Sequence, residues 1–230
     1  MSDLFRQAVL DLPVRSVTGR SDFFTAPENS QAIALIDSVP NGFHGAVLVG
    51  EKGCGKTHLA HLFAAAVFQK TGRKAAVMPA ADFNPLSLMD FLEESPYIVL
   101  ENVSQPVDEQ GLFHLLNAVK SLNGFVLLTA ERRPAAWGLT LPDLMTRLKA
   151  LPCVEIQPPG EMLMQAVLIK QFSDRQLKVA PEVIAYILRN MERSFSAASF
   201  IVKRADELSL ERKNGVTIPL IRQVLSEKKG

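Results

Sequence analysis

The sequence predicts an α/β fold in which a parallel β-sheet of about five strands is followed by a small all-helical domain. Short apolar runs alternate with helical segments from residue 46 to about residue 156, which is the pattern of strands joined by crossover helices. A glycine-rich turn joins the first run to a long helical segment. After residue 157 the strand signals end and only amphipathic helices follow. We therefore expect a sheet domain and a helical domain.

The predicted strands are rich in Val, Leu and Ile and lack polar alternation, as expected for strands that are covered on both faces. They span residues 46–50, 75–79, 97–101, 125–130 and 154–156. The helices between them are expected near residues 56–70, 86–94 and 108–122. Asp108 is a plausible N-cap for the third helix, and Asn123-Gly124 ends it.

The helical domain is expected to begin at the double proline, Pro158-Pro159. Its predicted helices span residues 160–174, 181–191, 194–213 and 217–228. Pro181 and Pro219 lie where first-turn prolines belong, and Thr217 is a plausible cap. The predicted domains are an N-terminal peptide and linker over 1–20, an α/β core over 21–157 and a helical domain over 158–230.

Composition excludes several classes of protein. The 25 Lys and Arg residues nearly balance the 24 Asp and Glu residues, so the total charge indicates no basic surface for nucleic acid. Two cysteines, Cys54 and Cys153, make no disulfide framework. No secretory signal opens the sequence, and no apolar run approaches the roughly 20 residues of a membrane helix. We expect a cytoplasmic protein without a membrane partner.

The stretch from Gly50 to Thr57 reads G-x-x-x-x-G-K-T, a phosphate-binding loop. Its glycines let successive backbone N–H groups point at a polyphosphate. Lys56 would reach the outer phosphates, and the Thr57 hydroxyl would hold Mg²⁺. The predicted ligand is ADP or ATP with Mg²⁺. The predicted nucleotide-binding residues of this segment are Gly50, Gly53, Cys54, Gly55, Lys56, Thr57 and His58.

Glu101 ends the third predicted strand, where phosphate-loop NTPases usually carry a carboxylate that holds Mg²⁺. The next residue is Asn102, at a position where many such enzymes place a second carboxylate to activate water. An amide cannot accept a proton from water at neutral pH. The sequence therefore predicts nucleotide binding with slow hydrolysis. Thr129, at the end of the fourth strand, is the candidate sensor of the γ-phosphate.

Taken in order, these segments resemble the AAA+ ATPases, and within them the bacterial replication initiator DnaA and its short relative Hda. The likeness spans residues 20 to 228. The residues that carry it are F-F-T-A-P-E-N at 23–29, the phosphate loop with its following His-Leu at 50–59, L-T-A-E-R-R-P at 128–134, L-P-D-L-M-T-R-L at 141–148, E-I-Q-P-P at 155–159 and E-R-S-F at 192–195.

The resemblance implies an AAA+ core with a C-terminal helical lid, and it implies roles for individual residues. Phe24 and Asn29 would line the base pocket. Arg147 matches the family's arginine finger, which reaches across a subunit contact to a neighbour's nucleotide. Arg193 matches the sensor-2 arginine, which comes from the lid onto the chain's own nucleotide. Thr129 would lie on the sensor-1 strand.

Two features separate DnaA from Hda. DnaA continues after the lid into a helix-turn-helix DNA-binding domain, whereas this sequence ends at Gly230, so we expect no module for reading duplex DNA. DnaA carries paired aspartates where this chain has Glu101 and Asn102, and Hda-type proteins also carry Asn at the second place. The resemblance is therefore to the Hda type, although Glu101 departs from both proteins.

Gln7, Leu10 and Leu12 near the N-terminus resemble the short peptide by which replication proteins dock on the β sliding clamp. Two leucines in an apolar pocket and a glutamine amide that forms hydrogen bonds would anchor such a peptide. In Hda the clamp motif stands at this place. DNA would then be contacted indirectly, through the clamp.

The resemblance thus implies an inhibitor of replication initiation that binds a nucleotide, docks on the clamp and promotes hydrolysis of DnaA-bound ATP through Arg147. Its own ATPase activity would be weak. A homodimer or a higher oligomer stays open. The alternative is an AAA+ helicase loader of the DnaC type, which would hydrolyse its own ATP and bind single-stranded DNA.

Overall fold

The computed structural model describes residues 24–39, 43–103, 108–212 and 214–227. The chain divides into two compact units. The core unit is Asn29–Gln157, and the helical unit contains the described residues from Pro158 onward together with residues 24–28. Each unit has its own hydrophobic core, so each is described by itself.

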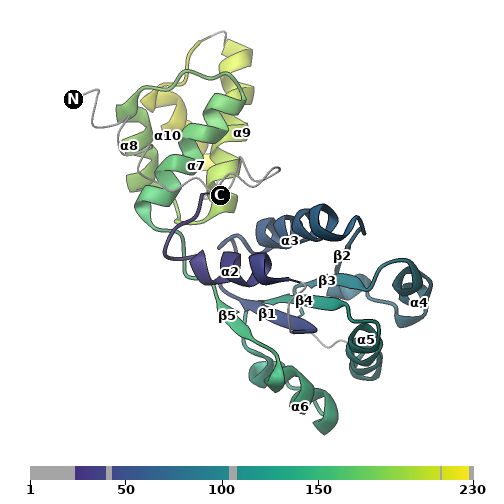
Figure 1. Ribbon diagram of the computed structural model, residues 1–230. Coiled ribbons are helices and arrows are strands. Elements are labelled where there is room, and N and C mark those ends of the chain that lie inside the picture. Colours follow the sequence, from purple (N-terminus) through teal and green to yellow (C-terminus); the bar gives the residue numbers. More distant parts are fainter. Residues whose placement is uncertain (1–23, 40–42, 104–107, 213, 228–230) are drawn as a thin grey trace. The chain divides into compact units, whose positions relative to one another are not determined.

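The core unit is built on a five-stranded sheet in the order β2-β3-β4-β1-β5, in which every paired strand is parallel (Figure 1). The strands are β1 (Gly45–Val49), β2 (Ala76–Pro79), β3 (Tyr97–Glu101), β4 (Phe125–Ala130) and β5 (Cys153–Glu155). All residues of β1 and β4 are buried, as their predominantly apolar sequences require. The predicted parallel α/β core is confirmed.

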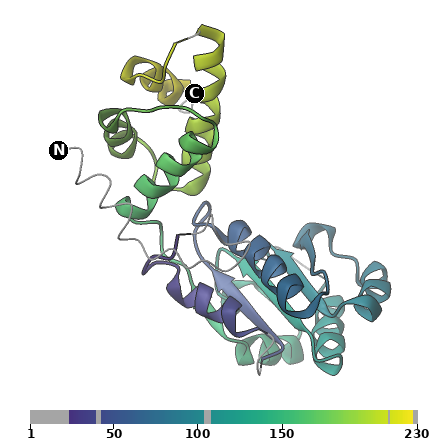
Figure 2. The same cartoon turned by 45° about the horizontal axis from the view of Figure 1, so that its top comes forward.

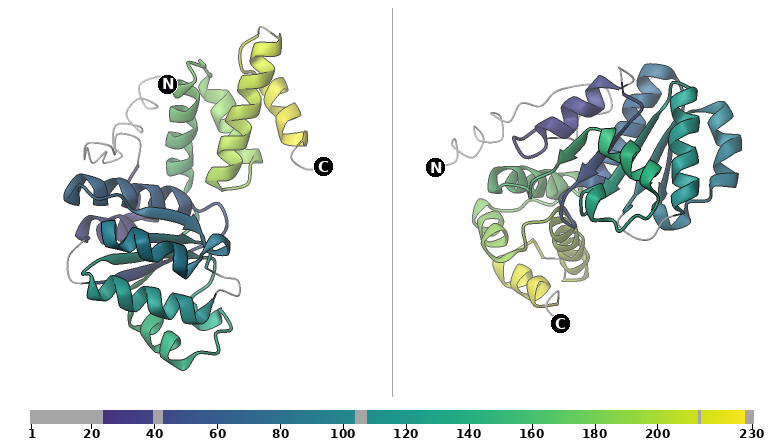
Figure 3. Two further views of the ribbon diagram at one scale, coloured as in Figure 1. Left: turned by 90° about the vertical axis from the view of Figure 1, so that its right-hand side faces the viewer. Right: turned by 90° about the horizontal axis from the view of Figure 1, so that it is seen from below.

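Helices cover both faces of this sheet (Figures 1 and 3). On one face, Phe63 of α3 stacks against Phe125 of β4 with 5.4 Å between ring centroids. On the other face, Val126 and Leu128 of β4 pack in one cluster with Leu112 of α5. The helices of the unit are α2 (Ser30–Ser38), α3 (Lys56–Thr71), α4 (Pro85–Glu94), α5 (Glu109–Ser121) and α6 (Pro142–Ala150), with short 3₁₀ turns η1 (Ala80–Asp82) and η2 (Pro134–Ala136).

Two of these helices, α2 and α6, have no counterpart among the helices expected from the sequence. Both are only nine residues long. Helix α6 buries just Leu144 and Leu148, so too few apolar positions repeat to indicate a helical period. Such short helices depend on packing against the rest of the unit for their stability, and a sequence pattern alone does not reveal that packing.

The helical unit contains four helices in its described part, as the sequence predicted (Figure 2). They are α7 (Glu161–Asp174), α8 (Pro181–Asn190), α9 (Phe195–Arg212) and α10 (Ile218–Glu227). Fully buried residues such as Leu168, Ile187 and Ile201 join α7, α8 and α9 in one apolar cluster. The predicted all-helical C-terminal domain is confirmed.

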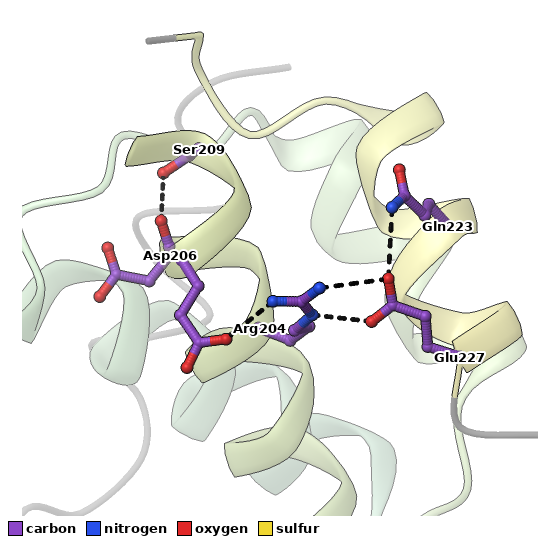
Figure 4. A network of polar contacts seen from close by, with 6 residues as sticks. Arg204, Asp206, Ser209, Gln223 and Glu227 are labelled. Carbon is purple, nitrogen blue, oxygen red and sulfur yellow. Dashed lines mark hydrogen bonds and ion pairs between the residues drawn. The ribbon is translucent and has the colours of Figure 1, made fainter. Parts of the chain in front are cut away.

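A polar network on the surface of the helical unit joins α9 to α10 (Figure 4). The Arg204 guanidinium donates from Nε to Glu227 at 2.7 Å and from Nη1 to Glu207 at 3.0 Å. Gln223 also donates to the Glu227 carboxylate, at 3.2 Å. The two carboxylates hold the pKa of Arg204 well above its ordinary value. The last described helix is thus fixed by charged contacts as well as by its apolar face.

Among the residues that the structure describes, no helix is both long enough and apolar enough to span a lipid bilayer.

Candidate nucleotide-binding site

The glycine-rich loop begins at Gly50, directly after β1. The Gly50 N–H donates to the Ala130 carbonyl of β4 at 3.1 Å, and the Ile156 N–H donates to the Val49 carbonyl at 2.7 Å. A Cβ on Gly50 would lie 2.6 Å from the Cys54 sulfur and 2.8 Å from the Ile156 carbonyl oxygen. Only glycine fits here, because both neighbours approach the backbone too closely for any side chain.

Two further glycines shape the turn. Gly53 and Gly55 have φ angles of 83° and 102°, in the left-handed region that favours glycine. Gly55 is the N-cap of α3, and no side chain caps the first turn of this 16-residue helix. Its first backbone N–H groups therefore point out of the helix end, where they and the helix dipole favour an anion such as phosphate.

Lys56 is the first residue of α3, and its side chain reaches back to the start of this loop. Its side chain is 7% exposed. Its ammonium group donates to the Gly50 carbonyl at 2.7 Å and to the Glu51 carbonyl at 2.9 Å. These hydrogen bonds offset the cost of burying the charge. A positive charge is thus held inside the turn, where the predicted role of Lys56 requires it. Thr57 and His58 follow on the exposed side of the first turn of α3.

Cys54 lies within the same loop and is buried. Burial raises the pKa of its thiol, and the nearby Lys56 charge opposes that shift only in part. The group therefore stays a neutral thiol at physiological pH. Cys54 contributes a small apolar side chain that packs under Gly50, rather than a reactive thiolate.

Glu101 ends β3 at the same edge of the sheet, with β4 between β3 and β1. Its Oε1 atom is buried and has no hydrogen-bond partner in the described part of the chain. A buried carboxylate oxygen normally has a donor or a cation as partner. The carboxylate of Glu101 and the hydroxyl of Thr57 are the hard oxygen ligands that Mg²⁺ takes together with phosphate oxygens. The residues present therefore fit this ion.

No cluster of three or more His, Cys, Asp or Glu side chains that could hold a metal by itself occurs among the described residues. Mg²⁺ is commonly bound by one or two protein ligands with nucleotide phosphates and water, so a magnesium site would need the nucleotide.

Asn102 and Thr129 connect the ends of β3 and β4. The Asn102 backbone has φ 60°, a left-handed conformation that Asn tolerates better than most residues. Its N–H donates to Thr129 Oγ1 at 3.1 Å, and the Val103 N–H donates to the Thr129 carbonyl at 2.8 Å. Thr129 is buried, so its hydroxyl has a structural task at the strand ends. Its role as γ-phosphate sensor stays a prediction.

Arg147 lies on α6 and is half-buried. Its guanidinium carbon is 4.9 Å from the centre of the Phe113 ring on α5, a distance at which a cation and an aromatic face attract each other. The neighbouring Leu144 and Leu148 are buried in the core cluster. Its role as a finger stays a prediction.

Glu109 was not identified by sequence reasoning, yet it fixes the segment that leads into α6. Its carboxylate accepts from the Thr140 N–H at 3.0 Å, from the Leu141 N–H at 2.6 Å and from the Thr140 hydroxyl at 3.2 Å. These hydrogen bonds lower the pKa of Glu109, chiefly those from the two backbone N–H groups. No local signal marks this role, since its partners lie 31 and 32 residues further along the chain.

The remaining predicted residues lie in the other parts of the chain. In the helical unit, the exposed Arg193 contacts Glu161 at 3.4 Å. Asn29 precedes α2, and its carbonyl accepts the Ile33 N–H at 3.0 Å. Phe24 is half-buried. An exposed ion pair such as Arg193–Glu161 contributes little and exchanges easily, so Arg193 can change partner at small cost.

The predicted clamp-binding residues, Gln7, Leu10 and Leu12, lie outside the residues that the structure describes. Their role stays a prediction from the sequence.

Comparison with known proteins gives one family match and several similar structures. Residues 162–225 match the family model of the Hda lid domain. Domain III of the replication initiation protein DnaA from Thermotoga maritima has a TM-score of 0.77 at 14% identity, over 90% of this chain and 94% of that chain.

AMPPCP-bound DnaA from Aquifex aeolicus has a TM-score of 0.66 at 20% identity, over 83% of this chain and 66% of that chain. The RuvB Holliday junction branch migration motor of Thermotoga maritima has a TM-score of 0.67 at 15% identity, over 87% and 69% of the two chains. At these identities the likeness establishes the fold.

Proposed function

We propose that this chain, an AAA+ protein of the DnaA type with an Hda-type lid, is a nucleotide-binding regulator of replication initiation. In this proposal it acts mainly on ATP held by DnaA rather than on its own nucleotide. The observation that carries the proposal is the combination of a well-formed phosphate loop with Asn102, an amide at the place of a general base.

The phosphate loop supports binding of ADP or ATP. Backbone N–H groups at the start of α3 and the Lys56 ammonium, which is buried in the loop, would bind a polyphosphate. Thr57 and Glu101 would hold Mg²⁺, which neutralises phosphate charge when bound. DnaA structures of similar fold carry AMPPCP, which agrees with a nucleotide site here. Phe24, Asn29 and Arg193 would complete it, as the resemblance implies.

Slow hydrolysis of the chain's own nucleotide follows from Asn102. Its side-chain amide can orient a water molecule but cannot accept the proton that water must lose. A bound nucleotide would then act as a stable structural ligand. The chain would need another protein's site for rapid ATP turnover.

Arg147 would supply that activity in trans. A guanidinium placed against a neighbour's γ-phosphate stabilises the charge of the transition state. We propose DnaA as the neighbour, because the lid matches the Hda family and the fold is that of DnaA domain III. A second segment, containing Gln7, Leu10 and Leu12, would dock the protein on the β sliding clamp.

The decisive experiment measures hydrolysis of DnaA-bound ATP with this protein, ADP and clamp loaded on DNA. We expect stimulation by the native chain and a loss of roughly a thousandfold in stimulated rate with Arg147→Ala, the magnitude typical of an arginine finger. Lys149→Ala is the matched control, since Lys149 is an exposed cation on the same helix. Equal losses in both variants would reject a specific role for Arg147.

Failure of the native chain to stimulate DnaA, together with ATP turnover by this chain on single-stranded DNA, would favour the helicase-loader alternative instead.

A truncation tests the clamp proposal separately. Removing residues 1–13 is expected to abolish binding to the clamp while fluorescent ADP still binds normally, because the phosphate loop lies in the core unit. The triple substitution Gln7→Ala, Leu10→Ala and Leu12→Ala should act like the truncation. Clamp binding that survives both changes would refute the docking peptide.

A further inference from the structure

We propose that Glu109 and Phe113 of α5 are positioning residues that hold α6 and the Arg147 guanidinium in place. The inference rests on the proposed function of Arg147 as a finger acting in trans. It adds two residues to that function which neither the sequence motifs nor the family resemblance identified.

Helix α5 is well fixed within the core unit. Its apolar side, with Leu112, Leu115 and Val119, is buried against the sheet. Asp108 caps its first turn by accepting the Gly111 N–H at 2.9 Å. Glu109 and Phe113 are four residues apart, so they lie on one side of the helix, one turn from each other. Both reach the segment 140–147, which contains the start of α6 and Arg147.

Glu109 holds the entry to α6. This helix has only nine residues. The side chain of its N-cap residue, Leu141, makes no hydrogen bond to the backbone N–H groups of the first turn. Pro142, its first residue, has no N–H to offer. The backbone donors just before it, on Thr140 and Leu141, are both taken by the Glu109 carboxylate. Hydrogen bonds to a charged acceptor are stronger than neutral ones, so α5 fixes where α6 begins.

The Phe113 ring contacts the guanidinium group at the end of the Arg147 side chain. The guanidinium carbon lies 4.9 Å from the ring centre, and the ring itself packs against the core cluster. An aromatic face attracts a guanidinium without neutralising its charge and leaves its N–H donors at the edges of the plane. A carboxylate in the same place would occupy those donors. The contact therefore restricts the long side chain while its charge and hydrogen-bonding groups stay available for a phosphate.

The first test compares variants at Phe113 in the DnaA hydrolysis assay. Phe113→Leu keeps apolar volume but removes the aromatic face. We expect a two- to fivefold lower maximal stimulated rate, the range of an exposed cation–π contact, with an unchanged half-saturating concentration of this protein. Phe113→Tyr, which keeps the ring, should restore the rate. Phe68→Leu changes a ring that is 53% exposed at the end of α3 and serves as the control.

Full activity of Phe113→Leu would overturn the role of the ring. A loss that Phe113→Tyr fails to restore would also overturn it, because a defect in packing alone would then explain the result.

A second measurement does not depend on any activity. The Nε–H resonance of Arg147, assigned in an NMR spectrum with Arg147→Lys, should carry a ring-current shift from Phe113. That shift should disappear in Phe113→Leu and persist in Phe113→Tyr. An unchanged resonance in Phe113→Leu would overturn the proposal even if DnaA is stimulated. A native chain that shows the shift but no stimulation would refute the finger and leave the contact established.

Hydrogen exchange tests Glu109. Its Oε2 atom accepts from both backbone donors, so the test needs a variant that removes both oxygens. In Glu109→Ala we expect the Thr140 and Leu141 amides to exchange at least about tenfold faster and the stimulated rate to fall. Gln110→Ala, at the exposed neighbouring position, should change neither. Unchanged protection of both amides in Glu109→Ala would overturn the role of Glu109.

Discussion

In the phosphate loop, the atoms that lie close to the backbone decide which residue type fits at each position. Gly50 is enclosed by the Cys54 sulfur and the Ile156 carbonyl, while Gly53 and Gly55 need left-handed backbone angles. Lys56 is buried because two loop carbonyls receive its ammonium group. These requirements are local and geometric. They explain why a glycine-rich motif that is readable in the sequence folds as that motif predicts.

Substitution of Gly50 tests this argument. Gly50→Ala would place a methyl group within 3 Å of the Ile156 carbonyl oxygen and the Cys54 sulfur, so we expect a loss of about 1–3 kcal/mol in the free energy of unfolding and much weaker binding of fluorescent ADP. Gly215→Ala is the control, since an added Cβ there meets no atom within 4 Å. Denaturant titration measures both variants. Similar stability of the two would contradict the packing argument.

Helices in this protein are held by contacts that reach across from a neighbouring helix. The entry to α6 is held from α5 by Glu109, and α10 is joined to α9 through Arg204 and Glu227. In both cases a charged side chain on a longer helix holds a shorter one of nine or ten residues. Helices this short are marginal alone, so these contacts add to their apolar packing.

Removal of Arg204 tests the second case. Arg204→Met keeps the aliphatic stem but loses the contacts to Glu227 and Glu207. We expect a small loss of stability that shrinks at high salt, because these side chains are partly exposed. Lys170→Met, which breaks the i,i+4 pair with Asp174, should cost about 0.3–0.5 kcal/mol. A loss of stability in Arg204→Met that does not depend on the salt concentration would argue against an electrostatic role of Arg204.

On the scale of the whole molecule, each of the two compact units buries apolar residues of its own. The core unit buries its sheet between helices, and the helical unit buries residues of α7 to α10 in its own cluster. A unit of about 70 residues lies near the lower limit for independent folding. The separate cluster leads us to propose that residues 158–230 form an autonomous domain.

Expression of residues 158–230 alone tests that proposal. We expect a helical circular dichroism spectrum and cooperative thermal unfolding. Ile187→Asp, at a position with no exposure, should abolish the transition because it buries a charge. Leu210→Asp, at a position that is 71% exposed, should leave it intact. A fragment without cooperative unfolding would show that this core depends on the rest of the chain.

The sequence predicted the fold class well because its evidence is local. Strands such as Phe125–Ala130 are buried throughout and apolar except for Thr129, and the long helix after Gly55 follows a recognisable loop. It did not predict α2 or α6, which are nine residues long and bury only three and two residues. Nor could it reveal Glu109 with Thr140, or Phe113 under Arg147, since these contacts exist only after α5 and α6 pack together.

The left-handed backbone of Asn102 has a consequence in genetic terms. That conformation favours Gly, Asn and Asp over larger or branched side chains, so few residues are acceptable at the end of β3. Of these only Asp could take a proton from water at neutral pH. Asn and Asp codons differ by one nucleotide, and the two side chains have nearly the same shape. The backbone at position 102 therefore accepts either Asn or Asp. Selection between the two residues can act on their chemistry alone.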